Sequence, residues 1–155
     1  MGNPEVTVDR QVHAPLERVW RAMTDLEAMP ARLSGVEGVE VLTPGPFGVG
    51  TRWRETRRMF GKQATEEMWV TACAAPTRYV AEADNSGMHY VSEFVLTERG
   101  PDLTNVRMIF SARPQEGHRM PLVARLLGGL GRRAVAKAIE KDLADVAAHV
   151  ERGTA

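Results

Sequence analysis

Cysteine and long apolar runs are almost absent from this chain. Cys73 is the only cysteine among 155 residues, which excludes an internal disulfide framework and any paired-cysteine zinc or redox motif. No stretch approaches the roughly 20 apolar residues of a membrane span, and residues 1–10 lack the apolar segment of a signal peptide. We therefore expect a protein without an integral membrane segment that works in a reducing compartment, the cytoplasm.

An excess of charge of either sign is lacking too. The chain carries 20 lysines and arginines against 20 aspartates and glutamates, so no global field attracts nucleic acid, and we expect no nucleic-acid partner. Its 4 histidines show no HxH or HExxH spacing, and neither a P-loop nor a GxSxG motif occurs. The sequence therefore predicts neither a metal site nor a cofactor.

Length and composition fit one domain. A chain of 155 residues with 43% hydrophobic residues is long enough to bury a core without disulfides or metal. No internal repeat, low-complexity linker or break in composition divides it. We predict a single domain over residues 1–155, acting as a monomer or a homodimer.

The hydrophobic period predicts a strand and two helices near the N-terminus. Polar and apolar residues alternate over Glu5–Val12, as in a half-buried strand. Pro15 then opens a helix that we expect to run to about Met23. The stretch from Thr24 to Glu27 predicts a capping box, followed by a second short helix that bends or ends near Pro30.

From residue 36 onward the period changes to two, and short turn signals separate the apolar stretches. The predicted strands are Val36–Thr43, Thr51–Met59, Lys62–Ala74, Arg78–Asn85, Met88–Arg99 and Leu103–Pro114. Their hairpin-length joints indicate an antiparallel meander. After Pro121, helical spacing continues to Val150 and predicts one helix of about thirty residues. The fold class is therefore α+β, in the order β-α-α-β6-α.

Several short motifs give the chain a family resemblance. They are Ala14-Pro15 before Val19-Trp20, which open an APxxxVWxxxTD pattern, then Thr24 to Glu27, Gly45-Pro46 and Val49-Gly50-Thr51. With the long terminal helix, they resemble the polyketide cyclase/dehydrase and lipid-transport superfamily, also called SRPBCC or START-like. The resemblance implies the helix-grip fold of pollen allergens, in which a curved seven-stranded antiparallel sheet surrounds the C-terminal helix. It also implies a cavity for lipids, quinones or polyketide intermediates, but similar shape does not transfer an activity.

Strand parity predicts which side chains face the terminal helix. A strongly curved sheet cannot close on one helix at every point, so these side chains either fill the gap or line a pocket. The predicted ligand-binding residues are Trp53, Met68, Tyr79, Tyr90, Ser92, Phe94, Met108, Phe110, Leu127 and Gly131. The same parity places Ala72 inward, and for most of these residues an ordinary core position is the alternative.

Two further features favour a pocket. Glycines at 128, 129 and 131 lie within the predicted helix, where each costs about 1 kcal/mol relative to alanine, which indicates close backbone approach or needed volume. Tyr90 and Ser92 would place hydroxyls among apolar walls and orient a ligand. A kinked helix and hydrogen-bonded core hydroxyls are the respective alternatives.

A pair of carboxylates adds possible chemistry. If Phe60-Gly61 forms a two-residue turn, Met59 pairs with Lys62, and Glu55 falls opposite Glu66 on the inner face. Two carboxylates held close in a low dielectric do not both ionise readily, so one would suit general acid or base work, with Arg57 offsetting the charge. Glu55, Glu66 and Tyr90 are thus the candidate catalytic residues, unless this hairpin end is simply exposed to solvent.

Three functions compete at this stage. The leading prediction is a non-enzymatic module that binds a small hydrophobic or aromatic molecule, such as a lipid, polyketide or quinone-like compound, by apolar burial. The alternative is a polyketide cyclase or aromatase that uses acid and base groups in the same cavity. The third is an interaction protein, which would be marked by exposed apolar area at the cavity mouth.

Overall fold

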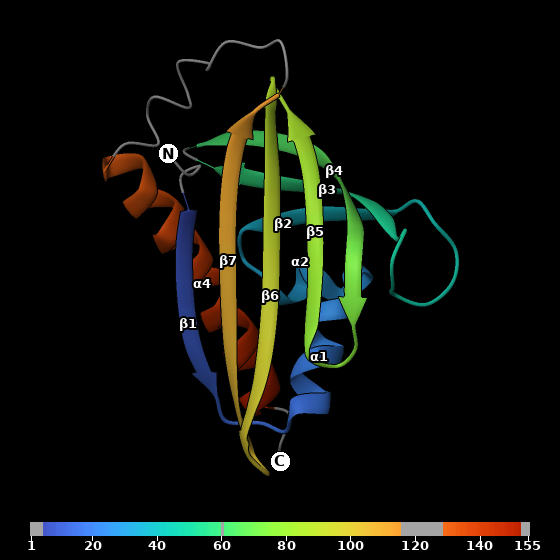
Figure 1. Ribbon diagram of the computed structural model, residues 1–155, viewed down its shortest axis with the longest axis vertical. Helices are drawn as coiled ribbons and strands as arrows, with labels where there is room; N and C mark the ends of the chain where they lie inside the picture. The colour runs from blue at the N-terminus through green and yellow to red at the C-terminus, as the bar shows by residue number, and fades with distance from the viewer. Residues whose placement is uncertain (1–4, 60, 116–128, 153–155) are drawn as a thin grey trace.

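The computed structural model describes residues 5–59, 61–115 and 129–152 and shows one curved sheet with helices on one of its sides (Figure 1). The elements are β1 Glu5–Val12, α1 Leu16–Thr24, the 3-10 turn η1 Leu26–Ala28, α2 Met29–Arg32, β2 Val36–Val41, β3 Arg52–Met59, β4 Lys62–Ala74, β5 Arg78–Asn85, β6 Met88–Gly100, β7 Leu103–Pro114 and α4 Gly129–Arg152. No helix among these residues is long and apolar enough to cross a membrane.

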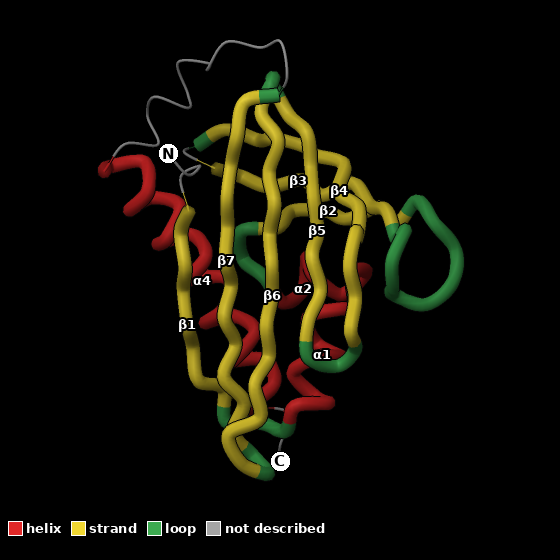
Figure 2. The backbone as a smooth tube through the Cα atoms, in the orientation of Figure 1, coloured by secondary structure: helices red, strands yellow, loops and turns green. Residues whose placement is uncertain are grey.

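The sheet has 7 strands in the order β1-β7-β6-β5-β4-β3-β2, and neighbouring strands are antiparallel. Figure 2 shows the long strands β1, β7, β6 and β5 side by side, with β2 and β3 turned across the back of them. Helices α1, α2 and α4 all lie behind the long strands, on the concave side. This arrangement confirms the predicted α+β helix-grip fold and its seven-stranded curved sheet.

The strand boundaries follow the sequence pattern closely. The predicted strands Glu5–Val12, Lys62–Ala74, Arg78–Asn85 and Leu103–Pro114 are those of the structure, and the others differ only at their ends. Gly61 has a φ of +75°, a conformation that glycine adopts without steric cost, so the β3–β4 turn is as tight as its sequence indicates. The described part of the last helix begins at Gly129, and the predicted start at Pro121 lies outside the described residues.

The predicted capping box is wrong. The hydroxyl of Thr24 donates to the carbonyl oxygen of Trp20 at 2.9 Å, inside the last turn of α1, and Asp25 makes no side-chain cap to the next helix. A threonine at a helix end can bond to the carbonyl four residues back, and that option is favoured here. Pro30 does not end a helix either, since it lies in the first turn of α2, where its missing N–H costs nothing.

A bulge overturns one predicted face. The register of β4 against β5 shifts between Val70 and Ala72, so Ala72 lies opposite Val80 and Cys73 opposite Tyr79. The extra residue turns the strand, which takes Ala72 off the inner face and places Cys73 against the core in its stead. Parity counted from the sequence holds only up to such a bulge.

The core lies between the concave face and the helices. One buried hydrogen bond connects the sheet to the segment that precedes α1. Thr104 of β7 is 0% exposed, and its hydroxyl donates to the carbonyl oxygen of Ala14 at 2.9 Å. Ala14 precedes α1, so this bond ties the start of the helical layer to the sheet.

Thr104→Val removes the hydroxyl but keeps the shape of the side chain. The buried Ala14 carbonyl would lose its partner, so we expect the free energy of unfolding to fall by about 1–3 kcal/mol in urea denaturation. Thr97→Val on β6, where the threonine is exposed, is the matched control and should change stability by less than about 0.5 kcal/mol. Equal effects of the two substitutions would show that the Thr104 bond is not an anchor.

Candidate ligand-binding site

A partly open cavity of about 60 Å³ lies between the sheet and the helices. Its walls come from Ala22, Met23, Met29, Arg32, Leu33, Arg57, Tyr79, Phe94, Asp142, Leu143 and Val146. The volume suffices for a few water molecules or for a small part of a ligand. The walls are mostly apolar, with the charged side chains of Arg57 and Asp142 among them.

Stacked aromatic rings form the sheet side of this cavity. Tyr79 and Phe94 are directly opposite in the β5–β6 register, and their rings stack at 4.6 Å between centroids. Trp20 and Phe47 meet Tyr79 edge to face at 5.7 and 5.0 Å. Burial, followed by the negative charge of Glu55, raises the pKa of the Tyr79 hydroxyl, which therefore stays protonated.

Arg57 connects the sheet to helix α4 through two ion pairs. Its Nε lies 2.5 Å from Glu55 Oε2, and its Nη2 lies 2.8 Å from Asp142 Oδ2. Burial by itself would lower the pKa of Arg57, but the charges of Glu55 and Asp142 outweigh it and raise that pKa. The guanidinium is thus permanently charged and compensates two carboxylates at once.

The loop after α2 covers this ion pair. A Cβ atom at Gly35 would lie 3.5 Å from Arg57 Nη1 and 3.7 Å from Asp142 Oδ1, so the loop backbone passes directly over both groups. The backbone N–H and the hydroxyl of Ser34 both donate to Asp145 Oδ2, at 3.0 and 2.9 Å. Sheet, loop and helix α4 therefore meet around one guanidinium.

The predicted carboxylate pair is present in the register. Met59 pairs with Lys62, and Glu55 lies opposite Glu66, as the two-residue turn requires. The two carboxylates have different surroundings, however. Glu55 is 7% exposed and accepts bonds on both oxygens, from Trp53 Nε1 at 3.3 Å and from Arg57. Glu66 is half-buried and accepts one from the Asn85 amide at 2.9 Å.

Tyr90 on β6 is near enough to Glu66 on β4 for the carboxylate charge to act on its hydroxyl. Burial, followed by the negative charge of Glu66, raises the pKa of the Tyr90 hydroxyl, so it stays protonated at neutral pH. Its ring stacks on Phe110 at 5.7 Å, next to Met88 and Ala112. A proton donor and a carboxylate thus lie together at the end of the concave face nearest the β3–β4 turn.

The predicted ligand-binding residues share the concave face but divide into groups. Tyr79 and Phe94 line the cavity. Trp53, Ser92 and Met108 are buried near it without lining it, and Met68, Tyr90 and Phe110 are half-buried farther along the face. Gly131 is half-buried in α4, and Leu127 lies outside the described residues. The contact of any of them with a ligand stays a prediction.

Several cavity residues were not anticipated, and one of them had a visible signal. Asp142 lies three residues after Ile139 and four before Val146, on the apolar stripe of α4, where a carboxylate needs a cationic partner. Met29, Arg32 and Leu33 had no such signal because they reach the cavity only through the path of the short α2.

A metal cluster is not formed by the described residues. Across residues 5–59, 61–115 and 129–152, no three His, Cys, Asp or Glu side chains gather closely enough to hold an ion.

Arg57→Met tests the link between the layers. It would leave Glu55 and Asp142 without their cationic partner, and we expect the free energy of unfolding to fall by about 2–4 kcal/mol. This loss is smaller than that expected on breaking a fully buried ion pair, because the Arg57 side chain is 25% exposed. Arg54→Met, at an exposed ion pair of β3, should cost less than about 1 kcal/mol. Urea denaturation measures both, and a mild effect of Arg57→Met would contradict a connecting role.

Comparison with known proteins agrees with this architecture. The family model for polyketide cyclase / dehydrase and lipid transport matches residues 3–151. No curated protein sequence matches the chain. Among solved structures, TTHA0849 from Thermus thermophilus superposes with a TM-score of 0.81 at 24% identity, over 98% of this chain and 100% of that one. The Zhui aromatase/cyclase from Streptomyces sp. R1128 superposes with a TM-score of 0.80 at 18% identity, over 96% of this chain and 93% of that one.

A third similar structure is Ara h 8.0201, with a TM-score of 0.72 at 13% identity over 97% of this chain and 99% of that one. At these identities the structural likeness establishes the fold and no activity. The family match spans nearly the whole chain and includes every element described above except the last residue of α4. The chain therefore belongs to the polyketide cyclase / dehydrase and lipid transport family.

Proposed function

We propose that this protein binds a small hydrophobic or aromatic molecule between the concave face of its sheet and helix α4. One observation carries the proposal: apolar side chains on the inner face stay partly exposed, both at the cavity and farther along the face. Met68, Phe94 and Phe110 are half-buried on the face that otherwise packs the core. Covering such area stabilises a complex by roughly 25 cal/mol per Å².

The ligand would follow strand β6. Phe94 lines the cavity, and Ser92 and Tyr90 continue the same face toward Glu66. The cavity of about 60 Å³ holds only one end of a ring system or chain, and the half-buried strip receives the rest. Met23 and Met29 in the cavity wall, being flexible and polarisable, adapt to the shape that enters. Tyr90 and Arg57 supply hydrogen-bond donors that orient polar groups on the ligand.

The proposal keeps two expectations from the sequence. The single cysteine, Cys73, fits a cytoplasmic protein, and a site built from one chain's sheet and helix fits a monomer or a homodimer. A small hydrophobic molecule is the only partner that the binding function requires.

Phe110→Ala tests the site with the neutral fluorescent probe N-phenyl-1-naphthylamine. Loss of the ring removes apolar contact area, and we expect the probe to bind about tenfold more weakly in a fluorescence titration. Trp69→Ala is the matched control, because Trp69 is a half-buried ring on the outer face and should change the affinity less than about twofold. A wild-type protein that does not bind the probe, or equal effects of both substitutions, would refute the proposal.

A cyclase or aromatase activity is the second candidate. Its support is the placement of Tyr90 near Glu66, with Glu55 across the strand pair, because a protonated hydroxyl and a carboxylate are the groups that acid and base catalysis of dehydration needs. A similar fold in proteins named aromatase/cyclase agrees with this candidate without establishing it.

Glu66→Gln separates the two candidates. In an enzyme it should lower the turnover of a linear poly-β-ketone by about 10²–10⁴-fold while the neutral probe still binds. In a pure binding protein the wild-type chain shows no cyclised product by mass spectrometry, and Glu66→Gln changes nothing but ligand orientation. Glu98→Gln, at an exposed site on β6, removes the same charge and is the matched control.

A further inference from the structure

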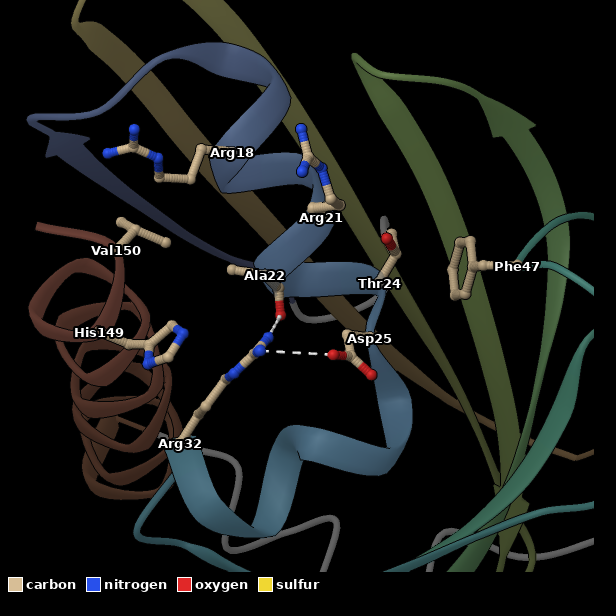
Figure 3. A pocket seen from close by; sticks show the side chains of 9 residues that line it. All are labelled: Arg18, Arg21, Ala22, Thr24, Asp25, Arg32, Phe47, His149 and Val150. Carbon is tan, nitrogen blue, oxygen red and sulfur yellow. Dashed lines mark hydrogen bonds and ion pairs between the residues drawn. The ribbon is translucent and has the colours of Figure 1, made fainter. Parts of the chain in front are cut away.

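A second hollow lies among the helices and adjoins the cavity described above, with which it shares Ala22 and Arg32. Figure 3 shows it between α1, the loop before β3, α2 and the end of α4. Its volume is about 430 Å³, within the roughly 300–1,000 Å³ of small-molecule sites. We call it the basic groove, and the residues that define it here are Arg18, Arg21, Arg32, Phe47, His149 and Val150.

Positive charge in the basic groove is only partly compensated. Three arginines line it against a single carboxylate, Asp25, and Asp25 Oδ2 is already 3.3 Å from Arg32 Nη2. Arg32 Nη1 also donates to the carbonyl oxygen of Ala22 at 3.1 Å. Neither Arg18 nor Arg21 forms an ion pair with any residue in the described part of the chain. Within the described residues, two cationic side chains of the groove are therefore without a carboxylate partner.

Arg18 shows this most directly. Its Nη1 atom is buried and has no hydrogen-bond partner among the described residues. A buried guanidinium nitrogen without an acceptor costs free energy, so the Arg18 side chain would gain by turning this atom toward a ligand oxygen in the groove. Arg21 follows Arg18 by three residues on α1, so the two side chains leave the helix on the same face. In Figure 3 both side chains start from α1, with the guanidinium of Arg18 directed toward the side of Val150 and that of Arg21 on the side nearer Phe47.

His149 lines the groove together with these arginines, and nearby positive charge affects its pKa. Burial, followed by the charges of Arg32 and Arg152, lowers the pKa of His149. The imidazole thus stays neutral where it lines the groove, and it can donate a hydrogen bond without adding charge.

An aromatic wall completes the groove. Phe47 packs edge to face on Trp20 and Tyr79, at 6.3 and 5.0 Å between centroids, so the core holds its ring in place. The same ring lines the groove, together with Val150. The fixed ring of Phe47, which lies across the hollow from Val150 in Figure 3, offers a surface for the flat apolar body of a ligand.

We propose that the basic groove binds a small aromatic anion, whose carboxylate or phosphate monoester is held by Arg18 and Arg21 and whose ring lies against Phe47. Arginine suits this task because its planar guanidinium donates two parallel hydrogen bonds to either group. The groove shares Ala22 and Arg32 with the inner cavity, but Arg18 and Arg21, which would hold the anion, do not line that cavity.

Three probes with the same ring system test the groove in calorimetric titrations of the full chain. They are 2-naphthoate, 2-naphthyl phosphate and the neutral 2-naphthalenemethanol. We expect the anions to bind at least about tenfold more tightly than the alcohol, with an affinity that falls as salt is added. The comparison of the two anions shows which head group is preferred. Equal affinities for all three probes, or no binding of either anion, would overturn the proposal.

Paired variants separate the groove from general electrostatics. Arg18→Gln with Arg21→Gln should weaken anion binding about tenfold or more and leave the alcohol unchanged. Arg132→Gln with Arg133→Gln removes the same charge from exposed positions about 24 Å away along α4 and should have less than a twofold effect. Equal losses in both pairs would mean non-specific attraction and would contradict the site.

The Phe110→Ala variant keeps this test independent of the inner site. It should leave anion binding unchanged, because Phe110 does not line the basic groove. If Phe110→Ala weakens anion binding and the Arg18 and Arg21 substitutions do not, the anions bind on the concave face and the groove proposal is wrong. Thermal denaturation confirms that each variant is folded before its titration.

Discussion

The ion pairs that Arg57 forms with Glu55 and Asp142 connect the concave face of the sheet to helix α4, and the inner cavity lies beside them. Charges at this depth must stay at hydrogen-bond distance from one another, because an unpaired buried charge is costly. The ion pairs thereby set the separation of sheet and helix at this point. Purely apolar residues would allow the layers to approach until the gap was filled.

The cluster of Glu55, Arg57 and Asp142 also holds the neighbouring loop and aromatic rings in place. The loop after α2 passes over it at Gly35 and is bound to α4 through Ser34 and Asp145. Tyr79, whose pKa is raised by burial and by Glu55, connects the cluster to the aromatic rings of the cavity wall. Ligand site, helix α4 and the α2 loop are therefore parts of one connected structure and do not vary independently.

Much of the fold could be predicted from the sequence because strands and helices have different hydrophobic periods. The β3–β4 hairpin is the clearest case, since a two-residue turn with Gly61 fixed the register that places Glu55 opposite Glu66. Prediction failed where one residue breaks the period, as at the bulge that displaces Ala72. It also failed at Thr24, where a local bond to Trp20 competed with the expected cap.

The site was less predictable than the fold for a physical reason. Parity shows which face a side chain is on, and it correctly placed Tyr79 and Phe94 inside. It does not show which residues of other elements approach them, because that depends on the curvature of the sheet and on the path of α2. Met29 and Arg32 reach the cavity by that path, and the binding roles predicted for Trp53 and the other face residues stay predictions.

The open side of the sheet at β2 has a consequence for contact between molecules. This edge strand is short, its pairing with β3 is irregular between Val36 and Gly38, and Glu37 and Glu40 are held by Arg58 and Arg54. A short, irregular and charged edge strand is a poor template for pairing with a strand from a second copy of the protein. The sheet can therefore have a free edge at β2 and a strongly curved inner face while that edge strand disfavours fibre-like association of molecules.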